Sequence, residues 1–84
     1  MAKQIKSVNQ LKTILADGET QDFFILLNGG LRSSKFISFD GDDTFYVENS
    51  IDGTEQELTA GELMDSDLTN IGEAISNGAF YLDD

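Results

Sequence analysis

The stretch DFFILLNGGLRSSKFISF, residues 22–39, constrains the fold more than any other part of the chain. It begins with a short apolar run of Phe, Ile and Leu, which is typical of a strand, and both alternating faces of that run are apolar. The Asn-Gly-Gly that follows tolerates the positive φ angles of a tight turn. Residues 31–39 then alternate as a return strand. We therefore expect an antiparallel hairpin whose first strand is central in its sheet.

Further strands are predicted after this hairpin. Residues 44–49 read as a third strand that follows a turn, and residues 55–58 as a short edge strand. Residues 79–82 predict either a final strand or a docked tail. Because side chains alternate along a strand, Phe36 and Tyr46 are expected to point away from the sheet face that carries the other aromatic residues of their strands.

Helices are predicted before and after the strands. Residues 7–18 begin with a capping box, have apolar side chains at helical spacing and end at a glycine. Thr59 with Glu62 repeats the capping-box pattern and predicts a short helical turn. Residues 70–78 predict a second short helix with Asn70 as its cap.

Length and composition fit one small domain. The chain has 84 residues, 39% of them hydrophobic, which is enough for a single packed core. Two short helices can cover one face of a sheet and not both. We therefore expect one domain over residues 1–84, of the α+β class, with a small antiparallel sheet of three to five strands and two short helices.

Charge is distributed very unevenly along the chain. Residues 1–35 contain all five cations and three acids, a net charge of +2, whereas residues 36–84 contain 13 acids and no cation, a net charge of −13. A domain this acidic repels nucleic acid and anionic membranes, so direct contact with either is not expected. It attracts basic surfaces, and nucleic-acid-binding proteins are the largest class that has them.

Several kinds of chemistry are excluded by the residues that are missing. There is no Cys and no His, so thiolate metal sites, disulfides and Ser-His or Cys-His catalysis are ruled out. A calcium loop starting at Asp40 would have Phe45 and Ile51 where Gly and a bidentate acid are needed. Ser33 and Lys35 share a strand face, but nothing in the sequence indicates that the lysine is desolvated. We expect no enzyme activity, no metal and no cofactor.

The longest apolar run is five residues, Phe23 to Leu27, too short to span a membrane, and the N-terminus lacks a signal-peptide pattern. A cytoplasmic protein is therefore expected.

The acidic half is the candidate binding surface. Like charges crowded together destabilise a compact state. An electrostatic field of one sign, with no opposite charges among its sources, is the kind that steers a partner toward the protein. Carboxylates about 5 to 7 Å apart on strands and turns approximate the phosphates along one nucleic-acid strand. Tyr46 and Phe36 are candidate apolar anchors within the acidic rim. The predicted partner-binding residues are Asp40, Asp42, Asp43, Tyr46, Glu48, Asp52, Glu55, Glu57, Glu62, Asp65 and Asp67.

In size, charge and compact α+β make-up, the whole chain resembles the small inhibitors carried by phages and plasmids: anti-CRISPR proteins, anti-restriction proteins and uracil-DNA glycosylase inhibitors. The resemblance is one of style and includes no shared motif. VENSI, Val47 to Ile51, is loosely similar to the acidic, serine-bearing edge strand with which uracil-DNA glycosylase inhibitors hook their enzyme. The stretches FFILLNGGLRSSKFISFD and TNIGEAISNGAF resemble those of short proteins on bacterial mobile elements.

Two hypotheses follow. In the first, the protein is an inhibitor that mimics DNA and occupies the positively charged nucleic-acid site of a bacterial defence or DNA-processing protein of the host. In the second, it is an interaction or accessory module of a phage or plasmid that does not mimic nucleic acid. The sequence is compatible with a monomer or a homodimer. Under the second hypothesis, a homodimer would form through the uncovered sheet face.

Overall fold

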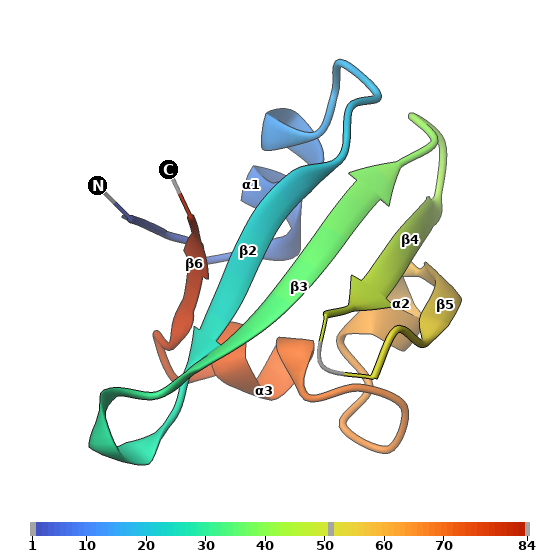
Figure 1. Cartoon of the computed structure of the whole chain (residues 1–84). Helices are drawn as coiled ribbons and strands as arrows, with labels where there is room; N and C mark the ends of the chain where they lie inside the picture. Colours follow the sequence, from blue (N-terminus) through green and yellow to red (C-terminus); the bar gives the residue numbers. More distant parts are fainter. Residues whose placement is uncertain (1, 51, 84) are drawn as a thin grey trace.

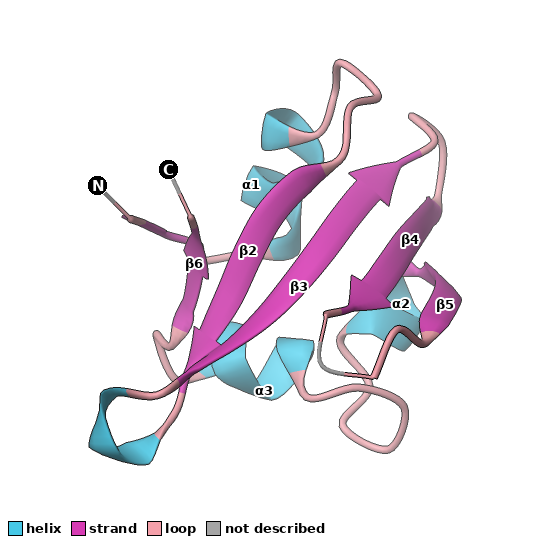
Figure 2. Cartoon of the chain, in the orientation of Figure 1, coloured by secondary structure: helices cyan, strands magenta, loops and turns pink. Residues whose placement is uncertain are grey.

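The computed structural model describes residues 2–50 and 52–83. They form one antiparallel sheet of six strands, three α-helices and one 3-10 turn (Figures 1 and 2). The elements along the chain are β1 (Lys3–Gln4), α1 (Val8–Ile14), β2 (Gln21–Leu26), η1 (Asn28–Gly30), β3 (Arg32–Phe39), β4 (Thr44–Asn49), β5 (Glu55–Thr59), α2 (Ala60–Leu63), α3 (Ile71–Ser76) and β6 (Phe80–Leu82).

The strand order is β1-β6-β2-β3-β4-β5. The α+β class and the antiparallel sheet are confirmed, but the predicted number of strands, three to five, is too low by at least one. The two-residue strand β1 has too little sequence to carry a pattern. It forms because the last strand, β6, lies in the sheet between β1 and β2 and pairs with both. The expectation that the first strand of the hairpin is central is confirmed, since β2 pairs with both β6 and β3, although Leu27 lies just beyond the end of β2.

The helices lie on one face of the sheet, behind it in the view of Figure 1. Leu11 of α1, Leu63 of α2 and Ile75 of α3 belong to a single buried cluster that also contains Phe23 and Phe45 of the strands. The prediction that helices cover only one face is therefore confirmed. Their predicted number, two, is too low, because the turn after Thr59 is long enough to form the short helix α2.

Local signals at the helix ends are mostly confirmed. The hydroxyl of Ser7 accepts the backbone N–H of Gln10 at 3.2 Å, and Thr59 and Glu62 form the complete capping box at the start of α2. At α3 the prediction is wrong in one detail. The side chain of Asn70 makes no capping hydrogen bond, and the hydroxyl of Thr69 accepts the N–H of Ile71 instead, at 2.9 Å.

The predicted tight turn at Asn28 is longer than a two-residue hairpin. Gly29 and Gly30 both have positive φ, and the N–H of Leu27 donates to the carbonyl of Leu31 at 2.7 Å, so a 3-10 turn closes the β2–β3 hairpin. The glycines are needed because side chains are strained at these φ values. The hairpin extends past the helical layer, at the lower left of Figure 1.

Candidate functional site: an acidic groove on the open sheet face

Strand alternation gives the sheet a second face that the helices leave uncovered. In β3 the odd-numbered residues from Ser33 to Phe39 are buried, while Ser34, Phe36 and Ser38 between them are partly exposed. The uncovered side of β2 to β6 is called the open face below. The predicted orientation of Phe36 and Tyr46, away from Phe39 and Phe45, is what the structure has.

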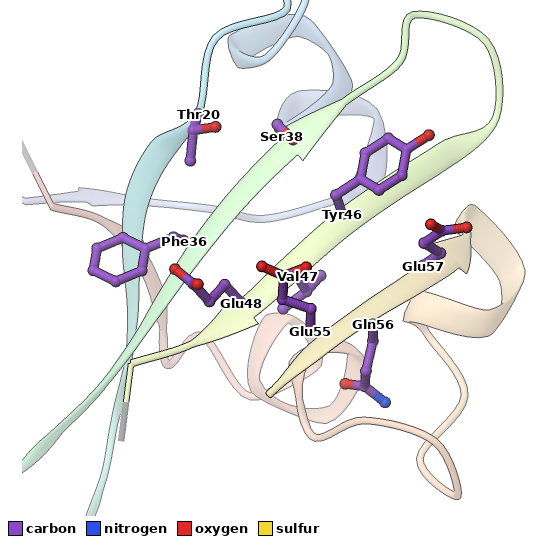
Figure 3. Close-up of a pocket in the computed structure, with 9 residues that line it drawn as sticks. All are labelled: Thr20, Phe36, Ser38, Tyr46, Val47, Glu48, Glu55, Gln56 and Glu57. Atoms are coloured by element: carbon purple, nitrogen blue, oxygen red, sulfur yellow. The ribbon is translucent and has the colours of Figure 1, made fainter. Parts of the chain in front are cut away.

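The strand register places three acids in one row across the open face. Asp22 pairs with Phe36, Phe36 pairs with Glu48, and Glu48 pairs with Glu55. Directly opposed side chains on one face of an antiparallel pair have Cβ atoms about 5 Å apart. Glu48 and Glu55 are therefore neighbouring carboxylates, and Figure 3 shows them side by side.

The next row adds a second aromatic residue and a third glutamate. Ser38 pairs with Tyr46, and Tyr46 pairs with Glu57. Tyr46 has 42% of its surface exposed, so its ring is accessible from the open face. In Figure 3 the rings of Phe36 and Tyr46 lie on opposite sides of the Glu48 and Glu55 carboxylates.

These two rows enclose a hollow of about 330 Å³ over β3, β4 and β5. We call it the acidic groove. Its lining residues are Thr20, Phe36, Ser38, Tyr46, Val47, Glu48, Glu55, Gln56 and Glu57 (Figure 3).

The negative charge of the groove is not neutralised from within the face. Among the described residues of β2 to β6, Arg32 is the one cation that the register places on the open face, and its guanidinium lies 4.2 Å from the centre of the Phe24 ring. Like charges directly opposite one another destabilise a sheet. The Glu48–Glu55 pair therefore weakens the fold that carries it.

Arg32 belongs to a second cluster on the open face that the sequence did not reveal. The Phe24 and Tyr81 rings stack with their centroids 5.2 Å apart, and Arg32 lies over Phe24. Phe24 is buried although it lies outside the main core cluster. Only the pairing of β6 with β2 brings Tyr81 to this place, and that pairing joins segments more than 50 positions apart in the sequence.

The residues predicted to bind a partner are divided among several places. Tyr46, Glu48, Glu55 and Glu57 line the groove. Asp40, Asp42 and Asp43 occupy the β3–β4 turn, and Asp52 lies in the β4–β5 turn. Glu62 is in α2, on the helical side, and Asp65 and Asp67 follow in the loop to α3.

Four of these acids stabilise local structure. The Asp40 carboxylate accepts the backbone N–H groups of Asp42, Asp43 and Thr44 at 2.8, 3.2 and 3.2 Å. These hydrogen bonds, led by the one from Asp42, hold the pKa of Asp40 below its ordinary value.

Asp52 accepts both the backbone N–H and the hydroxyl of Thr54, and these bonds lower the pKa of Asp52. Asp65 accepts the N–H of Asp67 at 2.9 Å, and Glu62 completes the capping box. At these four positions the turn or cap explains the acid without reference to a partner.

Lys35 is the buried cation of the sheet. It lies on the core face with Ser33, and each has 7% of its surface exposed. Burial lowers the pKa of Lys35, and the charge of Asp52 opposes that effect. Neither Lys35 nor Ser33 lines the acidic groove.

The described residues contain no group of three or more His, Cys, Asp or Glu side chains arranged to hold a metal ion. Within the same residues, no helix has the length and apolarity that crossing a membrane requires. Comparison with known proteins gave no significant match to a family model, to a curated protein or to a solved structure.

Proposed function

We propose that this protein is a binding protein without enzyme activity, and that its open sheet face docks on a positively charged surface of another protein. The observation that carries the proposal is the acidic groove, in which Glu48, Glu55 and Glu57 lie beside the exposed ring of Tyr46. Aromatic residues are enriched at protein interfaces, and charged side chains beside them favour a partner of opposite charge.

The partner surface that we propose is the nucleic-acid site of a bacterial defence or DNA-processing protein. Such sites are lined by Lys and Arg that contact phosphates. Glu55 and Glu57 are two positions apart on one strand face, a separation of about 7 Å, and Glu48 is one strand away, about 5 Å. These separations lie in the range that would imitate neighbouring phosphates. The proposal implies a cytoplasmic protein, because such partners work there.

A second candidate function is an interaction module that does not mimic nucleic acid. It is favoured by the number of acids outside the groove, because Asp40, Asp52, Glu62 and Asp65 have roles in turns and caps. Under this candidate the groove binds a basic segment of a partner outside any nucleic-acid site. Competition by DNA distinguishes the two.

The experiment is affinity capture from bacterial lysate with three forms of the protein: wild type, Glu48→Gln/Glu55→Gln/Glu57→Gln, and a control, Glu62→Gln/Asp67→Asn/Glu73→Gln. Both triple variants lose three negative charges. The control changes only residues away from the groove, and a glutamine in place of Glu62 can keep the capping box.

We expect wild type and control to retain the same partner at low salt and to lose it at high salt, because charge pairs at an interface are screened. The groove variant should not retain that partner. Release of the partner by added duplex DNA or by RNA supports mimicry, and retention in their presence supports the second candidate. Equal retention by wild type and groove variant would contradict the proposal.

A further inference from the structure

The acidic groove has a chemical specificity beyond its charge. Its centre is the Glu48–Glu55 pair, two carboxylates opposed across neighbouring strands, and its sides include the rings of Phe36 and Tyr46 (Figure 3). A ligand that fits such a site must be cationic, must reach two carboxylates at once and must have an apolar or flat surface for the rings.

The guanidinium group of arginine meets these requirements better than an ammonium group. It is planar, stacks on aromatic faces, and presents several N–H donors in a fixed arrangement that engages carboxylate oxygens in pairs. An ammonium group is a strongly hydrated point charge without a flat face. The volume of about 330 Å³ is at the small end of ligand sites, which suits a single side chain.

The open face already contains one arginine held in this way. The guanidinium of Arg32 lies 4.2 Å from the centre of the Phe24 ring, which is itself stacked on Tyr81. Arg32 and Phe24 come from β3 and β2, so the arrangement is built from neighbouring strands of the same face. The acidic groove likewise presents aromatic side chains from two neighbouring strands, β3 and β4, on that face. It has carboxylates beside these rings but no cation among the described residues that line it.

We propose that the acidic groove is a receptor for one arginine side chain of the partner protein, with its guanidinium between Glu48 and Glu55 and against Tyr46. This inference rests on the proposed function, because it names the group on the basic partner that the groove selects. Glu57, opposite Tyr46, adds a third carboxylate at the rim. The repulsion within the Glu48–Glu55 pair, which weakens the free protein, is reduced when the positive charge of the arginine lies between the two carboxylates.

The test is a titration of the whole ¹⁵N-labelled protein, followed by NMR, with three blocked peptides that differ at one position. The peptides are otherwise neutral and carry arginine, lysine or citrulline, which has the shape of arginine without its charge. We expect the arginine peptide to shift the amide signals of residues 46–48 and 55–57, and to bind about fivefold more tightly than the lysine peptide, a ratio of the size that cation–π stacking supplies. The citrulline peptide should produce no saturable shift.

Glu48→Gln/Glu55→Gln should lose the response to arginine, whereas Glu62→Gln/Glu73→Gln should keep it. The dispersion of the spectra shows whether each variant is folded. Tyr46→Leu keeps an apolar side chain and should reduce the preference for arginine over lysine without abolishing binding of either.

Equal binding of arginine and lysine would overturn the arginine inference and leave the proposed basic partner in place. Absence of any shift in the groove would also overturn the inference. The proposed function would then be judged separately, by whether partner capture still depends on the three groove glutamates.

Discussion

At the scale of the residue, identical carboxylates have different roles that the sequence does not separate. Asp40 and Asp42 are two positions apart in the same turn. The Asp40 carboxylate accepts three backbone N–H groups, and the adjacent Gly41 has a φ of 88°. Asp42 is exposed. Which of the acids in DGDD closes the turn depends on the backbone path and not on the local composition.

The hydrogen bonds of Asp40 lead to a prediction about stability and pH. Asp40→Ala should lower the melting temperature at pH 7, and the control Asp42→Ala should not, although both remove one charge. The pKa of Asp40 in the folded protein lies below its ordinary value of 3.8. Its ionised form is therefore favoured by folding, so the contribution of Asp40 is complete above that value and is lost as the pH falls through the folded pKa.

Thermal unfolding of wild type and Asp40→Ala between neutral pH and about pH 2 measures this effect. The difference in melting temperature between the two proteins should be constant around neutral pH and should become smaller below about pH 4. A difference that stays constant down to the lowest pH would mean that the Asp40 carboxylate is not held by the turn.

Strand alternation predicted the faces of individual residues but not their neighbours. It placed Phe36 and Tyr46 away from the core, and it placed Ser33 and Lys35 on one face. That face is the core face, where Lys35 is buried and its pKa is lowered. The depth of burial depends on the helices that cover the face, and a single strand does not encode them.

At the scale of the element, the helical layer depends on one close backbone approach. Gly72 lies in the first turn of α3, and a Cβ atom placed there would lie 2.6 Å from the Cα and carbonyl oxygen of Met64, the C-cap of α2. Both neighbours are backbone atoms, so they cannot rotate away. A glycine is required there because α2 and α3 pack against each other at that point.

Substitution of the two helical glycines should therefore have opposite effects. Gly72→Ala should lower the free energy of unfolding by about 2 to 3 kcal/mol, because overpacking forces a backbone shift. Gly61→Ala in α2 is the matched control, since a Cβ placed there has no atom within 4 Å apart from its chain neighbours and the backbone of its own helix. It should raise stability by about 0.5 to 1 kcal/mol, as alanine favours a helix.

Urea unfolding of the two variants and of the wild type gives these values. Equal stability of Gly72→Ala and wild type would show that α2 and α3 can separate at little cost. A loss of stability in Gly61→Ala would contradict the open surroundings of that residue.

The elements that the sequence predicted are those whose signals are local. The β2–β3 hairpin, α1, the Thr59–Glu62 capping box and β4 are each encoded by neighbouring residues. β1 was missed, and the final strand was not distinguished from a docked tail. Both depend on the β1–β6 pairing, which joins the two ends of the chain. The acidic groove was predicted in part. Strand alternation predicts which residues of β3 and β4 lie on its side of the sheet. The position of Glu55 and Glu57 beside them depends on the register between β4 and β5, which alternation does not give.

At the scale of the whole molecule, the fold turns the uneven distribution of charge along the sequence into an uneven distribution in space. The helices cover one face of the sheet, and the glutamates of β4 and β5 remain together on the other. Positive charge is concentrated in the part of the chain that supplies β1, α1 and the β2–β3 hairpin. The molecule is therefore polarised across its sheet, from the β1 edge toward the acidic β5 edge.

We predict that the negative charge of the groove lowers the stability of the free protein. Glu55→Lys replaces a like-charge pair with an attractive one, so it should raise the free energy of unfolding by about 0.5 to 1 kcal/mol at low salt. Asp67→Lys makes the same change in net charge in the loop between α2 and α3 and should stabilise less. Added salt should raise the stability of wild type and reduce the advantage of Glu55→Lys, because screening weakens repulsion between exposed charges.

Denaturant unfolding at about 0.02 M and about 0.5 M NaCl, on either side of the ionic strength at which the screening length is roughly 10 Å, measures both effects. A gain for Glu55→Lys that is no larger than that for Asp67→Lys, or that persists unchanged at high salt, would mean that the Glu48–Glu55 repulsion is negligible. If Glu55→Lys stabilises the protein more than Asp67→Lys does, and salt reduces that difference, then the free protein contains a repulsion that a single substitution removes. A repulsion of that kind is expected of a surface whose positive counterpart is supplied by a partner.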